Sequence, residues 1–110
     1  MTVELSRREK EEFIEQIKKL VDEAYKDAEI GMDYVRRSLK GCSLWMLSIG
    51  LGDVADSFGR VLTIKQLCKE LGIRIPYEIE KKMDEIIRMH WKAYRLRDEF
   101  HHTCECTVRE

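Results

Sequence analysis

The chain has 110 residues, the size of a single domain, and 37% of them are charged, well above the usual quarter. Its 20 basic and 21 acidic residues leave a net charge of −1, so no overall field draws the chain to nucleic acid or anionic lipid. The 44% share of hydrophobic residues fits a globular protein.

The start of the chain and its longest apolar run bear on its location. Residues 1–12 are mostly charged and do not resemble a secretory signal peptide. Residues 42–51 form the longest mainly apolar run, which is too short to span a bilayer. We therefore expect a cytoplasmic protein with no membrane partner. In that compartment free thiols are favoured over two disulfides for the four cysteines, Cys42, Cys68, Cys104 and Cys106.

The first predicted helix begins at a capping box. Ser6 is the expected N-cap, and Glu9 stands three residues later, where its carboxylate can reach back to the cap. Apolar residues then recur at helical spacing as far as Gly41, which is a natural C-terminal stop, so the helix would run about 35 residues. Gly31 is the most favourable place for a kink or break, and we leave open whether this segment is one helix or two.

A second helix is predicted over about residues 43–71. Gly50, Gly52 and Gly59 each lower its intrinsic propensity by nearly 1 kcal/mol relative to alanine. Three glycines in one helix indicate that another backbone packs closely against it. Gly72 is expected to end the helix, and residues 73–76 form an extended connector because the residue before Pro76 avoids the helical region.

The third helix is predicted from Tyr77 to about His102, followed by a short flexible tail from about residue 103. No segment alternates with period 2 for long enough to predict a strand. The expected fold is therefore an all-α single domain over residues 1–110. It would be an antiparallel bundle of three long helices, or of four if the first breaks near Gly31.

The third helix changes character along one face. Its stripe begins with apolar residues and ends with ionisable ones, in the order Ile79, Met83, Ile86, His90, Tyr94, Arg97 and His101. One interpretation is a solvated helix end, in which Arg97 pairs with an acid and the histidines complement the helix dipole. The other is a partly buried site for metal-free RNA cleavage, where an imidazole moves the proton and an arginine stabilises the phosphorane charge.

The order Arg97-Asp98-x-x-x-His102 resembles the Arg-polar-x-x-x-His signature of the HEPN superfamily, small all-α domains that include toxins of nucleotidyltransferase-linked toxin–antitoxin pairs. Residues 48–56 are similar to the small-residue helix of those toxins, and residues 71–76 resemble their connector. The likeness covers about residues 43–102. Two positions differ from the toxin branch, which usually has Asn where this chain has Asp98 and Tyr where it has Cys104.

The resemblance implies a role for each motif residue. Arg97 would be the phosphate-binding arginine, His102 the catalytic imidazole and Asp98 the polar residue that orients them. It also implies an active site formed across a homodimer, RNA as substrate and a cognate antitoxin protein as partner.

The C-terminal residues also suggest a metal site. His101, His102, Cys104 and Cys106 are four zinc-type ligands within six residues. Residues so close in sequence rarely enclose an ion alone, so Cys42, Cys68, His90 or a second protomer would have to complete the site. The competing interpretation is a frayed tail that carries cysteines, and on that interpretation we expect neither a metal nor a cofactor.

Two other residue sets have both a functional and a structural interpretation. The aromatic residues Trp45, Phe58, Trp91 and Tyr94 are expected in the core or at a dimer interface rather than around a cofactor. The basic residues Arg88, Lys92, Arg95 and Arg97 could contact an RNA backbone, or could form an ordinary solvated face.

Two functions from different classes therefore remain. The first is a HEPN-like, homodimeric domain that binds RNA or cleaves it without metal. The second is a non-catalytic helical bundle that serves as an assembly or adaptor protein, with the three glycines and the long first helix as its functional surface.

Overall fold

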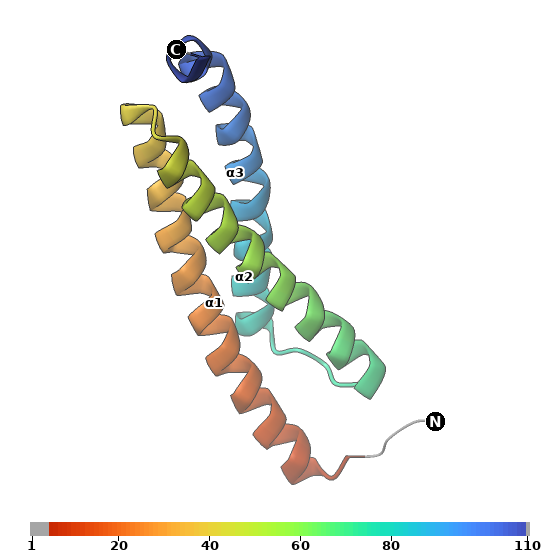
Figure 1. Ribbon diagram of the computed structural model, residues 1–110. Helices are drawn as coiled ribbons and strands as arrows, with labels where there is room; N and C mark the ends of the chain where they lie inside the picture. The colour runs from red at the N-terminus through yellow and green to blue at the C-terminus, as the bar shows by residue number, and fades with distance from the viewer. Residues whose placement is uncertain (1–4, 110) are drawn as a thin grey trace.

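The computed structural model describes residues 5–109, with side chains through residue 104. Three helices account for almost all of this part of the chain: α1 (Arg7–Gly41), α2 (Leu44–Leu71) and α3 (Tyr77–Arg109). All three contact one another, and no strand occurs among residues 5–109. They run up, down and up, so α1 and α3 are parallel while α2 crosses them at an angle (Figure 1). The predicted all-α fold is confirmed.

The start and the end of α1 are as the sequence predicts, and its left-handed cap is the residue after Gly41. The Ser6 Oγ accepts a hydrogen bond from the Glu9 N–H at 3.1 Å, and the Glu9 carboxylate accepts one from the Ser6 N–H at 3.2 Å. The helix continues through Gly31, so there are three helices rather than four. The helix ends at Gly41 and has 35 residues, as predicted. The left-handed C-cap is Cys42, with φ 48°, an uncommon conformation for a residue other than glycine.

The other helix boundaries follow local signals. The Ser43 Oγ accepts a hydrogen bond from the Met46 N–H and caps α2, and Gly72 ends that helix with φ 66°. The third helix begins after Pro76 and continues to Arg109, beyond the end that we predicted at about His102. The helix therefore occupies the segment where we expected a tail from about residue 103.

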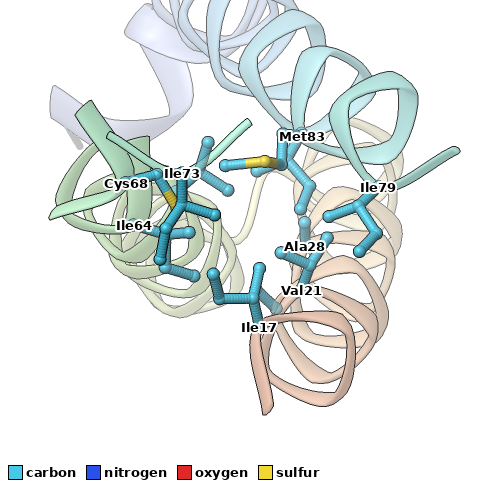
Figure 2. Packing of buried hydrophobic residues seen from close by; sticks show 11 residues of the cluster. Ile17, Val21, Ala28, Ile64, Cys68, Ile73, Ile79 and Met83 are labelled. Carbon is cyan, nitrogen blue, oxygen red and sulfur yellow. The ribbon is translucent and has the colours of Figure 1, made fainter. Parts of the chain in front are cut away.

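The core lies along the shared axis of the three helices in an elongated molecule of 61 × 24 × 19 Å. At one end, residues of all three helices and of the connector after Gly72 pack together, among them Ile17, Val21, Ile64, Cys68, Ile73, Ile79 and Met83 (Figure 2). At the other end, Phe100 packs with Val35, Leu47 and Cys104. Burial along the whole length explains how three helices without a fourth can hold together.

Gly31 and Gly50 mark the point where α1 and α2 approach most tightly. A Cβ atom added to Gly31 would lie 2.8 Å from the Gly50 carbonyl oxygen, and one added to Gly50 would lie 2.6 Å from the Gly31 carbonyl oxygen. The prediction of a close backbone is therefore confirmed for Gly50. It is wrong for Gly52 and Gly59, which have no neighbouring atom within 4 Å of such a Cβ, because they face outward from α2.

A disulfide joins the connection after α1 to the end of α3. It links Cys42 to Cys104, whose Cα atoms are 5.5 Å apart, across a sequence separation of 62 residues. The expectation of free thiols is therefore wrong for these two cysteines, since the bundle brings them to the same end. Cys68 is free and buried, as expected. No helix in the described part of the chain has the length and apolarity needed to cross a membrane.

Candidate functional site

A hollow with a concentration of charge lies between α1 and α3. It has a volume of about 510 Å³, and we call it the basic groove. Its lining residues are Glu29, Met32, Arg36, Glu85, Arg88, Met89, Trp91, Lys92 and Arg95. Four of these are cations and two are anions, so the groove is positive although the chain as a whole is not.

The charges in the basic groove are sorted along its length. Glu29 precedes Arg36 by seven residues in α1, and Glu85 precedes Lys92 by seven in α3, which is two helical turns or about 10 Å in each case. The helices α1 and α3 run parallel (Figure 1), and Glu85 and Glu29 both raise the pKa of Tyr25, so both acids lie at the same end. The other end, toward the C-terminus of α3, carries the cations alone.

The cations of the groove have no acidic partner in the part of the chain whose side chains are described. Among the side chains that the structure describes, Arg36, Arg88, Lys92 and Arg95 form no ion pair within 4.0 Å. Elsewhere most arginines are paired: Arg7, Arg8, Arg37 and Arg60 each contact a carboxylate. Among the described side chains, Arg74 is the remaining arginine without a pair, and it lies outside the groove. Unpaired guanidinium groups are therefore concentrated at this one site.

An aromatic ridge flanks the basic groove. The Trp91 side chain is 58% exposed and lines the groove, while its ring lies 6.2 Å from that of Tyr94. Trp91 and Trp45 do not belong to the core, because Trp45 is 70% exposed as well, and a dimer interface stays the prediction for both. Exposed rings beside cations are typical of surfaces on which nucleic-acid bases stack.

His102 and Arg97 lie on different sides of α3. Successive residues of a helix are rotated by about 100°, so five residues separate the two side chains by about 140° around the axis. His102 follows Arg95 by seven residues and therefore projects from nearly the same side as the groove cations. It is exposed, as is His101. Within one chain, the structure does not bring Arg97 and His102 into one cleft.

Arg97 instead belongs to a second hollow, the α2–α3 cavity. This cavity has a volume of about 270 Å³ and is lined by Leu51, Gly52, Val54, Ala55, His90, Ala93, Tyr94 and Arg97. The Arg97 guanidinium carbon lies 4.6 Å from the centre of the Tyr94 ring, and its Nη2 is 3.7 Å from the exposed Asp98 carboxylate. Asp98 thus contacts Arg97, as a residue that orients it would, and the structure shows no contact of Asp98 with His102.

His90 is the buried ionisable group of this cavity. Its ring stacks face to face on Phe58, with 3.9 Å between ring centres and 2° between their planes. The Trp91 and Tyr94 rings meet it edge-on. Desolvation by burial lowers the pKa of His90 from its ordinary value of 6.5, so the imidazole is neutral at pH 7.

The residues suggested for a metal site do not gather into one. Cys104 is bonded to Cys42, which removes both thiolates from the ligand set. His101 and His102 are exposed, and His90 and Cys68 are buried in other places. No group of three or more His, Cys, Asp or Glu side chains suited to a metal occurs within the described residues. The Cys106 side chain lies outside them.

Comparison with known proteins assigns no relative: no family model matches the chain, and neither a curated protein nor a solved structure matches it. The chain is thus an all-helical three-helix domain without a family assignment.

Part of the basic groove is visible in the amino-acid sequence, and the rest is not. The basic half of α3 was visible as Arg88, Lys92 and Arg95. Arg36 was not, because it comes from α1, 52 positions before Arg88, and only the parallel packing of α1 and α3 brings them together. Arg97 was assigned to the basic set by proximity in sequence, but it lies on the other side of α3.

Proposed function

We propose that this protein binds single-stranded RNA in the basic groove. The observation that carries the proposal is the set of four cations without acidic partners, Arg36, Arg88, Lys92 and Arg95, beside the exposed Trp91. Phosphate groups would take the place of the missing carboxylates, since phosphate contacts by Lys and Arg supply most sequence-independent affinity for nucleic acids. The resemblance to HEPN domains favours RNA over DNA.

The aromatic ridge favours a single strand. In a duplex the bases are paired and stacked, so an exposed indole has no base face to contact. Unpaired bases can stack on a side chain such as Trp91, and such stacking contributes about 1–3 kcal/mol per base. Guanidinium groups on one flank of the ring would hold the phosphates at the same time.

Charge reversal tests the proposal. We expect Arg88→Glu and Arg95→Glu each to weaken binding of a fluorescein-labelled single-stranded RNA by about tenfold or more in fluorescence anisotropy, because each replaces an attraction to phosphate by a repulsion. Arg74→Glu is the matched control, since Arg74 is also an unpaired arginine but lies outside the groove. Equal loss in all three variants would mean that only net charge matters.

Tryptophan fluorescence locates the bases. The chain has two tryptophans, so Trp45→Phe leaves Trp91 as its only indole and Trp91→Phe leaves Trp45. Stacking of bases on Trp91 should quench the fluorescence of the first variant and leave that of the second unchanged. The opposite pattern would place the RNA at the start of α2, beside Trp45.

RNA cleavage is a narrower form of this proposal and requires two copies of the chain. Arg97 and His102 point to different sides of one α3, so a shared site would combine Arg97 of one protomer with the partner's His102. A complementation assay tests this arrangement in excess chelator. Arg97→Ala and His102→Ala should each be inactive alone, and their mixture should regain about a quarter of the wild-type activity as mixed dimers form. An inactive mixture together with an active wild type would exclude the shared site.

The assembly alternative has an observation of its own. Leu44 and Trp45 are adjacent, 51% and 70% exposed, and stand at the start of α2. Exposed large apolar residues are typical of contact surfaces. Gly50, which we had placed on such a surface, is buried against α1 instead. Light scattering of Trp45→Ala tests the alternative, since loss of a wild-type dimer would favour it.

A further inference from the structure

The α2–α3 cavity has a mainly apolar lining and one imidazole that is able to form hydrogen bonds. His90 lines it and is only 8% exposed. Its ring nitrogens form no hydrogen bond with any residue that the structure describes. Among the described residues, the Ser57 Oγ is the one fully enclosed side-chain nitrogen or oxygen atom without a hydrogen-bond partner. The His90 nitrogens, which also lack a partner, are therefore not fully enclosed. The imidazole can therefore form a hydrogen bond with a molecule that enters the cavity.

The charge of the cavity is carried by a single group. Arg97 is the one charged residue in its lining, and it stands at the solvent side with its side chain 41% exposed. Its contact with Asp98 is long, 3.7 Å, and the Asp98 side chain is 67% exposed, so this pair is weak and open to competition. The Arg97 fork is thus free to bind a carboxylate of a ligand in two-pronged geometry.

We propose that the α2–α3 cavity binds a small monocarboxylic acid with an apolar body, with Arg97 on its carboxylate and the His90 imidazole hydrogen-bonded to the ligand. One cation matches one negative charge, whereas a phosphate monoester would bring about two. The aliphatic part of the lining, Leu51, Val54 and Ala93, suits an apolar body. A volume of about 270 Å³ lies just below the usual range for ligand sites, so the acid must be small.

Small residues of α2 give the ligand access. Gly52 and Ala55 are exposed and line the same cavity, and a Cβ on Gly52 would meet nothing within 4 Å. A ligand can therefore approach the α2 backbone closely at this position. Gly52 thus has a use that the packing of the bundle does not explain.

The site is separate from the basic groove. Its lining comes from α2 and α3, whereas that of the groove comes from α1 and α3, and the two share no residue. The proposal therefore does not rest on RNA binding, and each can fail without the other.

Benzoate is the probe, since it is a small monocarboxylate with an apolar body, and benzamide is its neutral counterpart. Wild-type protein titrated with benzoate should show saturable shifts of the His90 ring signals in NMR spectra, with a dissociation constant of about 1 mM or lower. Benzamide and inorganic phosphate should each bind at least about tenfold more weakly. The proposal would be overturned if the NMR shifts did not saturate at a benzoate concentration about tenfold above that dissociation constant. Equal binding of benzoate and benzamide would also overturn it.

Variants locate the probe. Gly52→Leu should fill the mouth of the cavity and weaken benzoate binding about tenfold or more, and Arg97→Gln should do the same by removing the charge. Gly59→Leu is the matched control, because Gly59 is an equally open glycine of α2 that does not line this cavity. Arg88→Glu should leave benzoate binding unchanged. Equal effects of Gly52→Leu and Gly59→Leu, with both folded by circular dichroism, would refute the assigned location.

Discussion

The Gly31 and Gly50 backbones meet where α1 and α2 cross. A Cβ on Gly50 would lie 2.6 Å from the Gly31 carbonyl oxygen and 2.7 Å from a methyl group of Val35, distances that no relaxed structure accommodates without movement. Both residues are buried. The glycine at position 50 therefore sets how closely the two helices pack, and with it the position of the residues that follow in α2.

The first prediction concerns this crossing. Gly50→Ala should destabilise the protein by about 1–3 kcal/mol, because a methyl group forced into a packed contact costs more than the helix propensity it gains. Gly59→Ala should stabilise it by about 0.5–1 kcal/mol, since Gly59 is in open space and only the propensity counts. Urea denaturation followed by circular dichroism measures both. A Gly50→Ala variant as stable as Gly59→Ala would show that the crossing relaxes freely.

The contrast between these glycines shows how far sequence reasoning reaches. Ser6 and Glu9 specify the start of α1 by themselves, and Gly72 specifies the end of α2, because each signal acts on its own helix. The role of Gly50 depends on which face of α2 meets α1, and that is decided by the whole bundle. The sequence therefore predicted a closely packed backbone at all three glycines of α2, and the structure has one only at Gly50.

The same limit applies to the candidate site. Arg97 and His102 are close in sequence, and this suggested a common site, but helix rotation separates their side chains. The contribution of Arg36 to the basic groove and the pairing of Cys42 with Cys104 both join distant segments. Contacts between residues that are distant in the chain leave no periodic pattern in a single sequence, so they could not be predicted from it.

The second prediction concerns the disulfide. Closing a loop of 62 residues in the unfolded chain corresponds to about 4 kcal/mol of stabilisation in the chain-entropy description. Dithiothreitol should therefore lower the free energy of unfolding by roughly that amount. The double variant Cys42→Ala/Cys104→Ala is the control and should not respond to the reductant. Peptide mapping after alkylation without reduction should find Cys42 joined to Cys104, and alkylated Cys104 in that digest would contradict the bond.

The third prediction concerns pH. Burial lowers the pKa of His90 from 6.5, so in the window just below 6.5 the unfolded chain binds a proton that the folded protein does not. The stability that the folded protein gains from keeping His90 neutral is present above pH 6.5. It is lost as the pH falls toward the pKa that His90 has in the folded protein. The free energy of unfolding should therefore decrease between pH 7 and pH 5.

A substitution isolates the His90 contribution. His90→Phe can keep the stacking on Phe58 while removing the titrating group, so its stability should fall less over the same pH range. NMR titration of the wild-type imidazole gives an independent measurement. A His90 pKa at or above 6.5 would contradict the effect of burial.

The fourth prediction concerns the salt dependence of RNA binding, which rests on the proposed function. If Arg36, Arg88, Lys92 and Arg95 each neutralise one phosphate, the logarithm of the association constant should fall with the logarithm of salt concentration with a slope of about −3. Arg95→Ala should make that slope less steep by about 0.7, and Arg74→Ala should leave it unchanged. Trp91→Phe should weaken binding at every salt concentration without changing the slope, because stacking releases no counterions. A slope that changes equally for Arg95→Ala and Arg74→Ala would place the RNA outside the basic groove.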